Sequence, residues 1–320
     1  MGSALFPGHA LHYLQLPGQR SGEAAHEHLL LVHGLAANLA FWNAGIALPL
    51  SRRFHFHVLA YDLRGHGRST VTPCGYSLEH QASDLEALLD HLRLDRVHVL
   101  SHSYGGAVAT LFALRQPERV ASLMLADVRL RALQPTQRLC DWAYWPQWRG
   151  RLERLGARLD PQLPEGGFNL LCELARLHLL HPQGGRLLPA LFAAPPRART
   201  KAGNTAQHWL DLVSRTSLFR EFCYPDSITE ERLRALRVPV LALYGAHSNT
   251  LPTAQALARL CADCELQVLP EVGHFFPMSH PKLLLRAVSG FLRRRLGLGG
   301  ADAGQPDGDA DQASEGPSPA

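Results

Sequence analysis

Short apolar runs alternate with helix-like patterns along most of the chain, and this alternation constrains the fold more than any other feature. It predicts an α/β fold with a mainly parallel central sheet and helices on both faces. A length of 320 residues fits one such domain with an insertion. The predicted strands cover 28–33, 56–61, 97–100, 121–126, 238–244 and 266–269. The predicted helices cover 77–92, with Ser77 as N-cap, and 104–116, 253–262 and 282–295.

The alternation stops between Val128 and Leu236. This stretch has no strand-like run of comparable strength, carries four tryptophans and is interrupted repeatedly by Pro and Gly. We therefore predict a helical cap over the carboxyl ends of the strands, where open α/β sheets place their sites. The expected organisation is a core part in 1–127, a cap in 128–236, a second core part in 237–296 and a disordered acidic tail in 297–320.

Composition argues against several classes of function. The net charge is +4 and the basic excess is scattered, so we expect a solvated surface and no nucleic-acid partner. No stretch approaches the roughly 18 apolar residues of a membrane span, and the N-terminus lacks a signal-peptide pattern. Apart from an isolated C-x-x-C at Cys261 and Cys264, the six cysteines show no framework or metal-ligand spacing. We expect a cytoplasmic protein with reduced thiols and no metal or organic cofactor.

The run Ser101-His102-Ser103-Tyr104-Gly105 lies between a predicted strand and a predicted helix. A nucleophile elbow has this arrangement, because the sharp turn lifts a hydroxyl off the sheet edge. Small residues two before and two after the nucleophile keep strand and helix apart, and Ser101 stands here where glycine is usual. We interpret Ser103 as a nucleophile, and a small-residue turn without chemistry is the alternative.

His274 follows the last predicted strand and precedes the last predicted helix, beside Gly273. A general base that activates a serine is expected on such a loop. We interpret His274 as that base, and one more surface histidine among eighteen is the alternative.

An oxyanion hole needs two backbone N–H donors aimed at the developing charge. Tyr104, at the predicted helix start, supplies one candidate. Leu35 supplies the other, in the turn His33-Gly34-Leu35 after the first predicted strand. His33 is interpreted as a turn histidine rather than a metal ligand, because no cluster of Asp or Cys completes a metal site.

The order and spacing of these pieces resemble the α/β-hydrolase superfamily over roughly residues 11–296. The run Asp62-Leu63-Arg64-Gly65-His66-Gly67-Arg68-Ser69 is similar to the D-x-R-G-x-G-x-S turn common there, which we interpret as structural. With serine at the elbow, the resemblance implies an esterase, a thioesterase or a C–C bond hydrolase. Epoxide hydrolases and haloalkane dehalogenases are disfavoured, because they use aspartate at this point.

The stretch that usually carries the third member of the triad has no carboxylate. In most members of the superfamily an acid follows the strand that matches 238–244, but here the chain reads Gly245-Ala246-His247-Ser248-Asn249-Thr250. Some branches take the acid from the end of the strand that matches 121–126, where Asp127 lies. We therefore expect Asp127 to hold His274 in its tautomer. The alternatives are a polar strand end without a role, and Ser248 or Asn249 as a neutral partner of His274.

Together these residues predict acyl transfer. Ser103 attacks an ester carbonyl while His274 takes its proton, Leu35 and Tyr104 hold the oxyanion, Asp127 steadies His274, and water releases the acid. The Trp- and Leu-rich cap predicts a largely apolar small-molecule acyl substrate, with an arginine excess suited to an acidic group. The alternatives are a thioesterase or C–C bond hydrolase with the same residues, and a binding protein that kept the fold without the chemistry.

Overall fold

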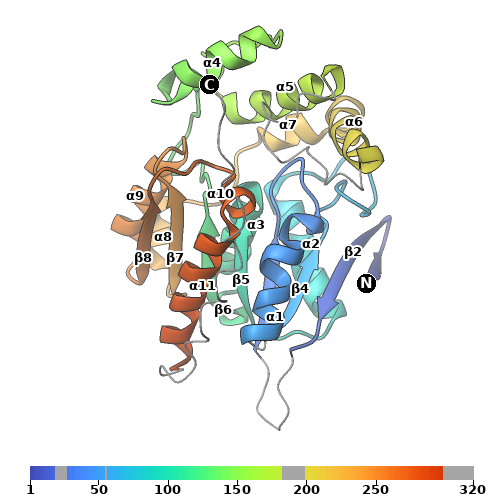
Figure 1. Ribbon diagram of the computed structural model, residues 1–320. Coiled ribbons are helices and arrows are strands. Elements are labelled where there is room, and N and C mark those ends of the chain that lie inside the picture. Colours follow the sequence, from blue (N-terminus) through green and yellow to red (C-terminus); the bar gives the residue numbers. More distant parts are fainter. Residues whose placement is uncertain (19–26, 55, 182–198, 298–320) are drawn as a thin grey trace, which may run out of the picture.

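The computed structural model describes residues 1–18, 27–54, 56–181 and 199–297. These residues form an eight-stranded sheet with the strand order β1-β2-β4-β3-β5-β6-β7-β8 (Figure 1). Strands β3 to β8 pair in parallel, while β1 and β2 add an antiparallel edge. The strands are β1 (Gly2–Phe6), β2 (His9–Leu16), β3 (His28–Val32), β4 (His57–Tyr61), β5 (Val97–His102), β6 (Val120–Ala126), β7 (Val240–Gly245) and β8 (Cys264–Leu269).

The predicted fold class is confirmed, and each of the six predicted strands lies within two residues of its expected ends. Strand β7 shows why the central strands were recognisable, since all six of its residues are buried and a strand covered on both faces reads as a continuous apolar run. Strands β1 and β2 were not predicted. Their side chains are mostly half-buried or exposed, so their sequences carry no such run.

Helices cover both faces of the sheet. On one face, Leu85, Val108 and Leu257 bury against the sheet, and on the other Leu50 and Val288 do so. The first face carries α2 (Leu78–His91), α3 (Tyr104–Arg115), α8 (Glu230–Ala235) and α9 (Leu251–Leu260), and the second carries α1 (Leu48–Phe54), α10 (Phe276–Ser279) and α11 (Pro281–Leu296). A parallel sheet is stable only with both faces covered in this way.

The ends of two helices follow from local chemistry. Ser77 is the N-cap of α2, as predicted, and its side chain accepts a hydrogen bond from the N–H of His80. Helix α11 ends at Gly297 with φ +64°, a left-handed conformation that suits a glycine cap. The predicted acidic tail lies outside the described residues from 298 onward.

The helices between residues 145 and 222 lie beyond the carboxyl ends of the strands (Figure 1), and a separate hydrophobic cluster is buried among them. Trp145, Leu174, Trp209 and Leu218 are buried in it. Its helices are α4 (Trp145–Arg154), α5 (Gly166–Leu180), α6 (Arg199–Arg215) and α7 (Leu218–Phe222). We refer to α4 to α7 as the cap. Leu233, by contrast, packs into the sheet cluster, so α8 belongs with the core by packing although it precedes the predicted boundary at residue 236.

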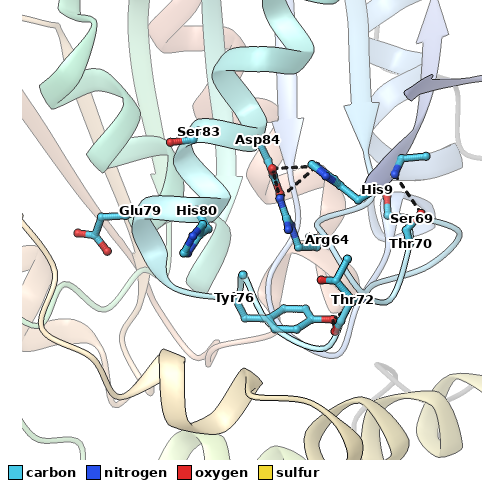
Figure 2. Close-up of polar contacts among 12 residues, drawn as sticks. His9, Arg64, Ser69, Thr70, Thr72, Tyr76, Glu79, His80, Ser83 and Asp84 are labelled. Atoms are coloured by element: carbon cyan, nitrogen blue, oxygen red, sulfur yellow. Dashed lines mark hydrogen bonds and ion pairs between the residues drawn. The ribbon is translucent and has the colours of Figure 1, made fainter. Parts of the chain in front are cut away.

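The turn 62–70 is a junction of the core (Figure 2). Arg64 donates to both carboxylate oxygens of Asp84 on α2, at 2.8 and 2.5 Å, and lies 3.1 Å from the ring of His9 on β2. Asp62 is buried and accepts from the N–H groups of Leu39 (2.7 Å) and Arg68 (2.9 Å). These contacts tie β2, α2 and the segment around Leu39 to the turn that follows β4, in agreement with a structural interpretation of this turn.

The helices in the described ranges include none that combines the length and the apolar character needed to cross a membrane.

Candidate active site

Ser103 lies between β5 and α3 in a strained turn, with φ 54° and ψ −128°. A non-glycine residue in such a conformation costs on the order of 1–3 kcal/mol and persists only where its surroundings hold it. The surroundings here are crowded backbone, because a Cβ at Gly105 would lie 2.3 Å from the carbonyl oxygen of His33. Ser101 fits where glycine is usual, since its hydroxyl is fully buried and donates to the carbonyl of Met124 at 3.2 Å.

The structure brings Ser103, His274 and Asp127 together. The Oγ of Ser103 lies 3.1 Å from Nε2 of His274, and Nδ1 of His274 lies 2.8 Å from Oδ1 of Asp127. Each residue follows the carboxyl end of a parallel strand, β5, β8 and β6 respectively. If Nδ1–H donates to the carboxylate, Nε2 is left to accept the proton of Ser103 O–H, which is the tautomer that nucleophile activation requires.

Asp127 is fully buried yet held as an anion. Its Oδ2 accepts from the N–H of Gly245 at 2.9 Å, and its Oδ1 accepts from the hydroxyls of Ser248 and Thr250. Burial acts to raise the pKa of this carboxyl. The hydrogen bond and charge of His274, with the donors from Gly245 and Ser248, outweigh burial and hold the pKa below its usual value.

The loop 245–250 contacts the carboxylate rather than the imidazole. Ser248, weighed as a direct partner of His274, instead donates to Asp127, and the carbonyl of Asn249 accepts from Nε2 of Gln134 at 2.8 Å. Sequence reasoning missed the role of Ser248 and Thr250. Both hydroxyl residues follow β7, which neighbours the strand that ends before Asp127, but no local pattern pairs them with its carboxylate.

His102 holds the loop that carries His274. Its Nε2–H donates to the backbone carbonyl of His274 at 2.9 Å, and its ring stacks on Phe41 with centroids 4.8 Å apart. Burial, and then the neighbouring His274, lower the pKa of His102 to about 3. The ring is therefore neutral near pH 7 and serves as a fixed donor, a role that the sequence pattern did not reveal.

The two residues predicted to form an oxyanion hole, Leu35 and Tyr104, line the same cavity as Ser103. Tyr104 is the first residue of α3, and the first N–H groups of a helix have no partner within it. The turn before Leu35 lies against the nucleophile, since a Cβ at Gly34 would be 2.9 Å from Cβ of Ser103. The ring of His33 fixes this turn by contacts with the carbonyl of Gly34 (2.8 Å) and the N–H of Leu63 (3.1 Å).

A cavity of about 440 Å³ opens between Ser103 and the cap, a size typical of small-molecule sites. Its wall combines core residues and Trp142, which precedes α4, with mainly apolar cap residues, among them Trp148, Phe168, Leu174 and Phe222. Four charged residues also reach it, namely Arg129, Arg131, Glu221 and Asp226.

Glu221 connects the cap to the core through hydrogen bonds. This residue of α7 accepts from the N–H groups of Gly75 (3.0 Å), Tyr76 (2.7 Å) and Ser77 (2.9 Å), at the start of α2. Burial opposes ionisation, but the donors from Ser217 and these three amides hold the pKa of Glu221 below its usual value. A carboxylate near the N-terminus of α2 is also favoured by the helix dipole.

No group of three or more His, Cys, Asp or Glu side chains within the described ranges is arranged to hold a metal ion.

Comparisons with known proteins agree with this geometry. The sequence profile of the alpha/beta hydrolase fold family matches residues 27–281. A protein of Variovorax paradoxus, provisionally named carbamate hydrolase RutD, is 28% identical over 301 residues, which cover 89% of this chain and 96% of that protein. The 2-hydroxy-6-oxo-2,4-heptadienoate hydrolase of Pseudomonas putida is 28% identical over 273 residues, covering 82% and 88% of the two chains.

A solved structure of a thermophilic esterase from Thermogutta terrifontis is also similar. It superposes with a TM-score of 0.59 at 26% identity and covers 92% of this chain and 97% of its own. The family profile spans most of the described core and cap. The chain therefore belongs to the α/β-hydrolase family.

Proposed function

We propose that this protein is a serine hydrolase that cleaves a carboxylic ester through an acyl-enzyme intermediate. The observation that carries the proposal is the hydrogen-bonded series Ser103–His274–Asp127, whose first two members line the cavity. Nucleophile, base and orienting acid within hydrogen-bond reach of one another are the arrangement that acyl transfer needs. Hydrolase names among the similar proteins support the same class of reaction.

The reaction begins when Ser103 Oγ bonds to the carbonyl carbon and its proton passes to Nε2 of His274. The amides of Leu35 and Tyr104 bind the negative oxygen of the tetrahedral intermediate, where one such donor contributes about 3–4 kcal/mol. Asp127 stabilises the imidazolium that forms. His274 then gives its proton to the departing alkoxide, and water attacks the acyl-enzyme to release the acid and restore Ser103.

A C–C bond hydrolase is the second candidate, because the relative from Pseudomonas putida is named a hydrolase of 2-hydroxy-6-oxo-2,4-heptadienoate, a compound without an ester bond. The same nucleophile and base would serve that reaction. The mainly apolar wall of the cavity supports a small-molecule substrate with a largely apolar body in either case.

A fluorophosphonate probe tests the shared chemistry. We expect it to label Ser103 in the wild-type protein and to leave Ser103→Ala unlabelled, while Ser101→Ala serves as a matched control that keeps the nucleophile. Turnover of graded p-nitrophenyl esters, acyl-CoA thioesters and a dienoate diketone then separates esterase, thioesterase and C–C bond hydrolase. A folded wild-type protein that takes up no probe would show a binding protein on a hydrolase fold instead.

A further inference from the structure

Two arginines enter the cavity directly downstream of Asp127, and their partners differ. Val128 and Leu130 are buried in the sheet cluster, and the alternating residues Arg129 and Arg131 line the cavity together with Leu130. Both belong to the segment that leads from β6 into the cap. A positive charge at a mainly apolar wall is costly unless an anion compensates it.

Arg129 has a full set of partners. Its Nε donates to the carbonyl of Gln134 (2.9 Å), its Nη2 to the carbonyl of Pro135 (2.6 Å) and its Nη1 to Oε2 of Glu165 (2.6 Å). This arginine therefore fixes the entry of the chain into the cap, and its charge is balanced by Glu165.

Arg131 is less well satisfied, because its Nη2 is buried without a hydrogen-bond partner among the described residues. Its Nη2 lies 3.1 Å from Oε1 of the same Glu165, in an ion pair that does not have hydrogen-bond geometry, so one carboxylate serves two guanidinium groups. The guanidinium lies over the ring of Phe222, 4.6 Å from its centroid, and the thiol of Cys223 is a further polar neighbour. Packing on an aromatic face holds the group in place while leaving donors for a ligand.

The two acids of the cavity wall have partners of their own. Glu221 accepts from three backbone N–H groups at the start of α2. Asp226 accepts from the N–H of Ile228 at 3.0 Å. Burial raises the pKa of Asp226 above its usual value although the charges of Arg131 and Arg129 act to lower it, so this carboxyl balances the two arginines less firmly than an exposed one would.

We propose that the substrate carries a carboxylate, which Arg131 binds while the ester carbonyl lies at Ser103. A guanidinium binds a carboxylate through two parallel N–H donors, with more geometric specificity than a point charge provides. The inference rests on the proposed function and narrows its substrate to an ester that also carries a free carboxylate, on either its acyl or its alcohol part. Ser103 bonds to the acyl carbon, the alkoxide leaves with the proton from His274, water releases the acid, and the bound carboxylate passes through unchanged.

Binding to a variant that cannot turn over separates this inference from the hydrolysis itself. Calorimetry on Ser103→Ala would compare monomethyl esters of diacids, from succinate to suberate, with the matching monoamide esters, in which a neutral amide replaces the carboxylate. Acetate esters of hydroxy acids form a second series, which places the carboxylate on the alcohol side. In one of the two series, we expect the ester with a carboxylate to bind about tenfold more tightly than the neutral ester of the same length, at one favoured chain length.

The added substitution Arg131→Gln should abolish that preference, and Arg131→Lys should restore part of it, since a charge returns without the fork of donors. Arg149→Gln is the matched control and should keep the preference, because Arg149 is exposed on the cap and pairs with Glu153 at 2.6 Å. Equal affinity for charged and neutral esters, or a preference that survives Arg131→Gln, would overturn the inference. A preference in Ser103→Ala, with no ester turnover by the wild type, would sustain the anion site and refute the ester hydrolase.

Discussion

Two neighbouring loops at the same edge of the sheet differ in what they contribute to the site: one carries the carboxylate that contacts His274, and the other donates hydrogen bonds to that carboxylate. Strands β6 and β7 run in parallel with Ala126 opposite Leu243, and the N–H of Asp127 donates to the carbonyl of Leu243 at 2.9 Å. The loop after β6 supplies the carboxylate, and the loop after β7 supplies the hydroxyls of Ser248 and Thr250 that hold it. In most members of the superfamily that the sequence resembles, the acid follows the strand that matches β7.

The comparison teaches that the place of the charge and the place of its support can be exchanged across adjacent strand ends. Oδ1 of Asp127 lies where His274, Ser248 and Thr250 meet. A base needs a carboxylate oxygen at that point and can take it from either strand. Variants in the two loops test whether the carboxylate must follow β6 and whether its hydrogen-bond donors must follow β7.

The largest effect is expected from Asp127→Asn. The amide carries no charge to stabilise the imidazolium and favours the wrong tautomer of His274, so kcat should fall about 10⁴-fold. Ester turnover measures the loss, and thermal melting establishes that the variant is folded. A loss below about tenfold would mean that the β6 loop does not orient the base.

Adding Ser248→Asp to Asp127→Asn tests whether the charge can move to the other loop. The side chain of Ser248 already reaches Asp127, so a carboxylate at 248 lies near the imidazole. A restored charge-assisted hydrogen bond contributes about 1.5–3 kcal/mol, and we expect the double variant to regain about tenfold in kcat over the single one. No regain would show that backbone placement at 127 is required.

Ser248→Ala should reduce kcat by about tenfold, because it removes one donor from a buried carboxylate. The pKa of Asp127 is lowered in the folded protein, so its contribution to stability is present above the ordinary value of 3.8 and is lost as the pH falls through the lowered one. Without Ser248 the folded-state pKa rises toward 3.8, so this contribution becomes smaller and its loss is complete at a higher pH. Urea unfolding between about pH 3 and pH 7 measures the shift, and superimposable curves for variant and wild type would contradict it.

The smallest effect is expected from Asn249→Ala, in the same loop as Ser248. The contact that Asn249 makes with Gln134 uses its backbone carbonyl, which alanine retains. Turnover should stay within about twofold of the wild type. A loss comparable to that of Asp127→Asn would reverse the assignment and make Asn249 the partner of the base.

The central fold was predictable because strands buried on both faces read as apolar runs. Strands β1 and β2 were not predicted, because their side chains are mostly half-buried or exposed. Helix α1 was not predicted, because seven residues make too short a periodic pattern.

The candidate site was predictable where strand ends determine it. The ends of parallel strands meet at one edge, so Ser103, Asp127 and His274 could be expected near one another, and their separations in the structure fit that expectation. Their catalytic roles stay predictions. Contacts between loops were not readable: His102 reaches a carbonyl 172 positions away, and Ser248 a carboxylate 121 positions away. No local pattern encodes such pairings.

The backbone at Ser103, with φ 54° and ψ −128°, favours glycine far more than serine. A protein selected for heat resistance alone would therefore be expected to discard the hydroxyl and relax the turn, gaining stability on the order of 1–3 kcal/mol. At this one residue, a substitution that raises thermostability would also remove the reactive hydroxyl. Efforts to stabilise the protein should leave the elbow untouched and look instead to its surface and its cap.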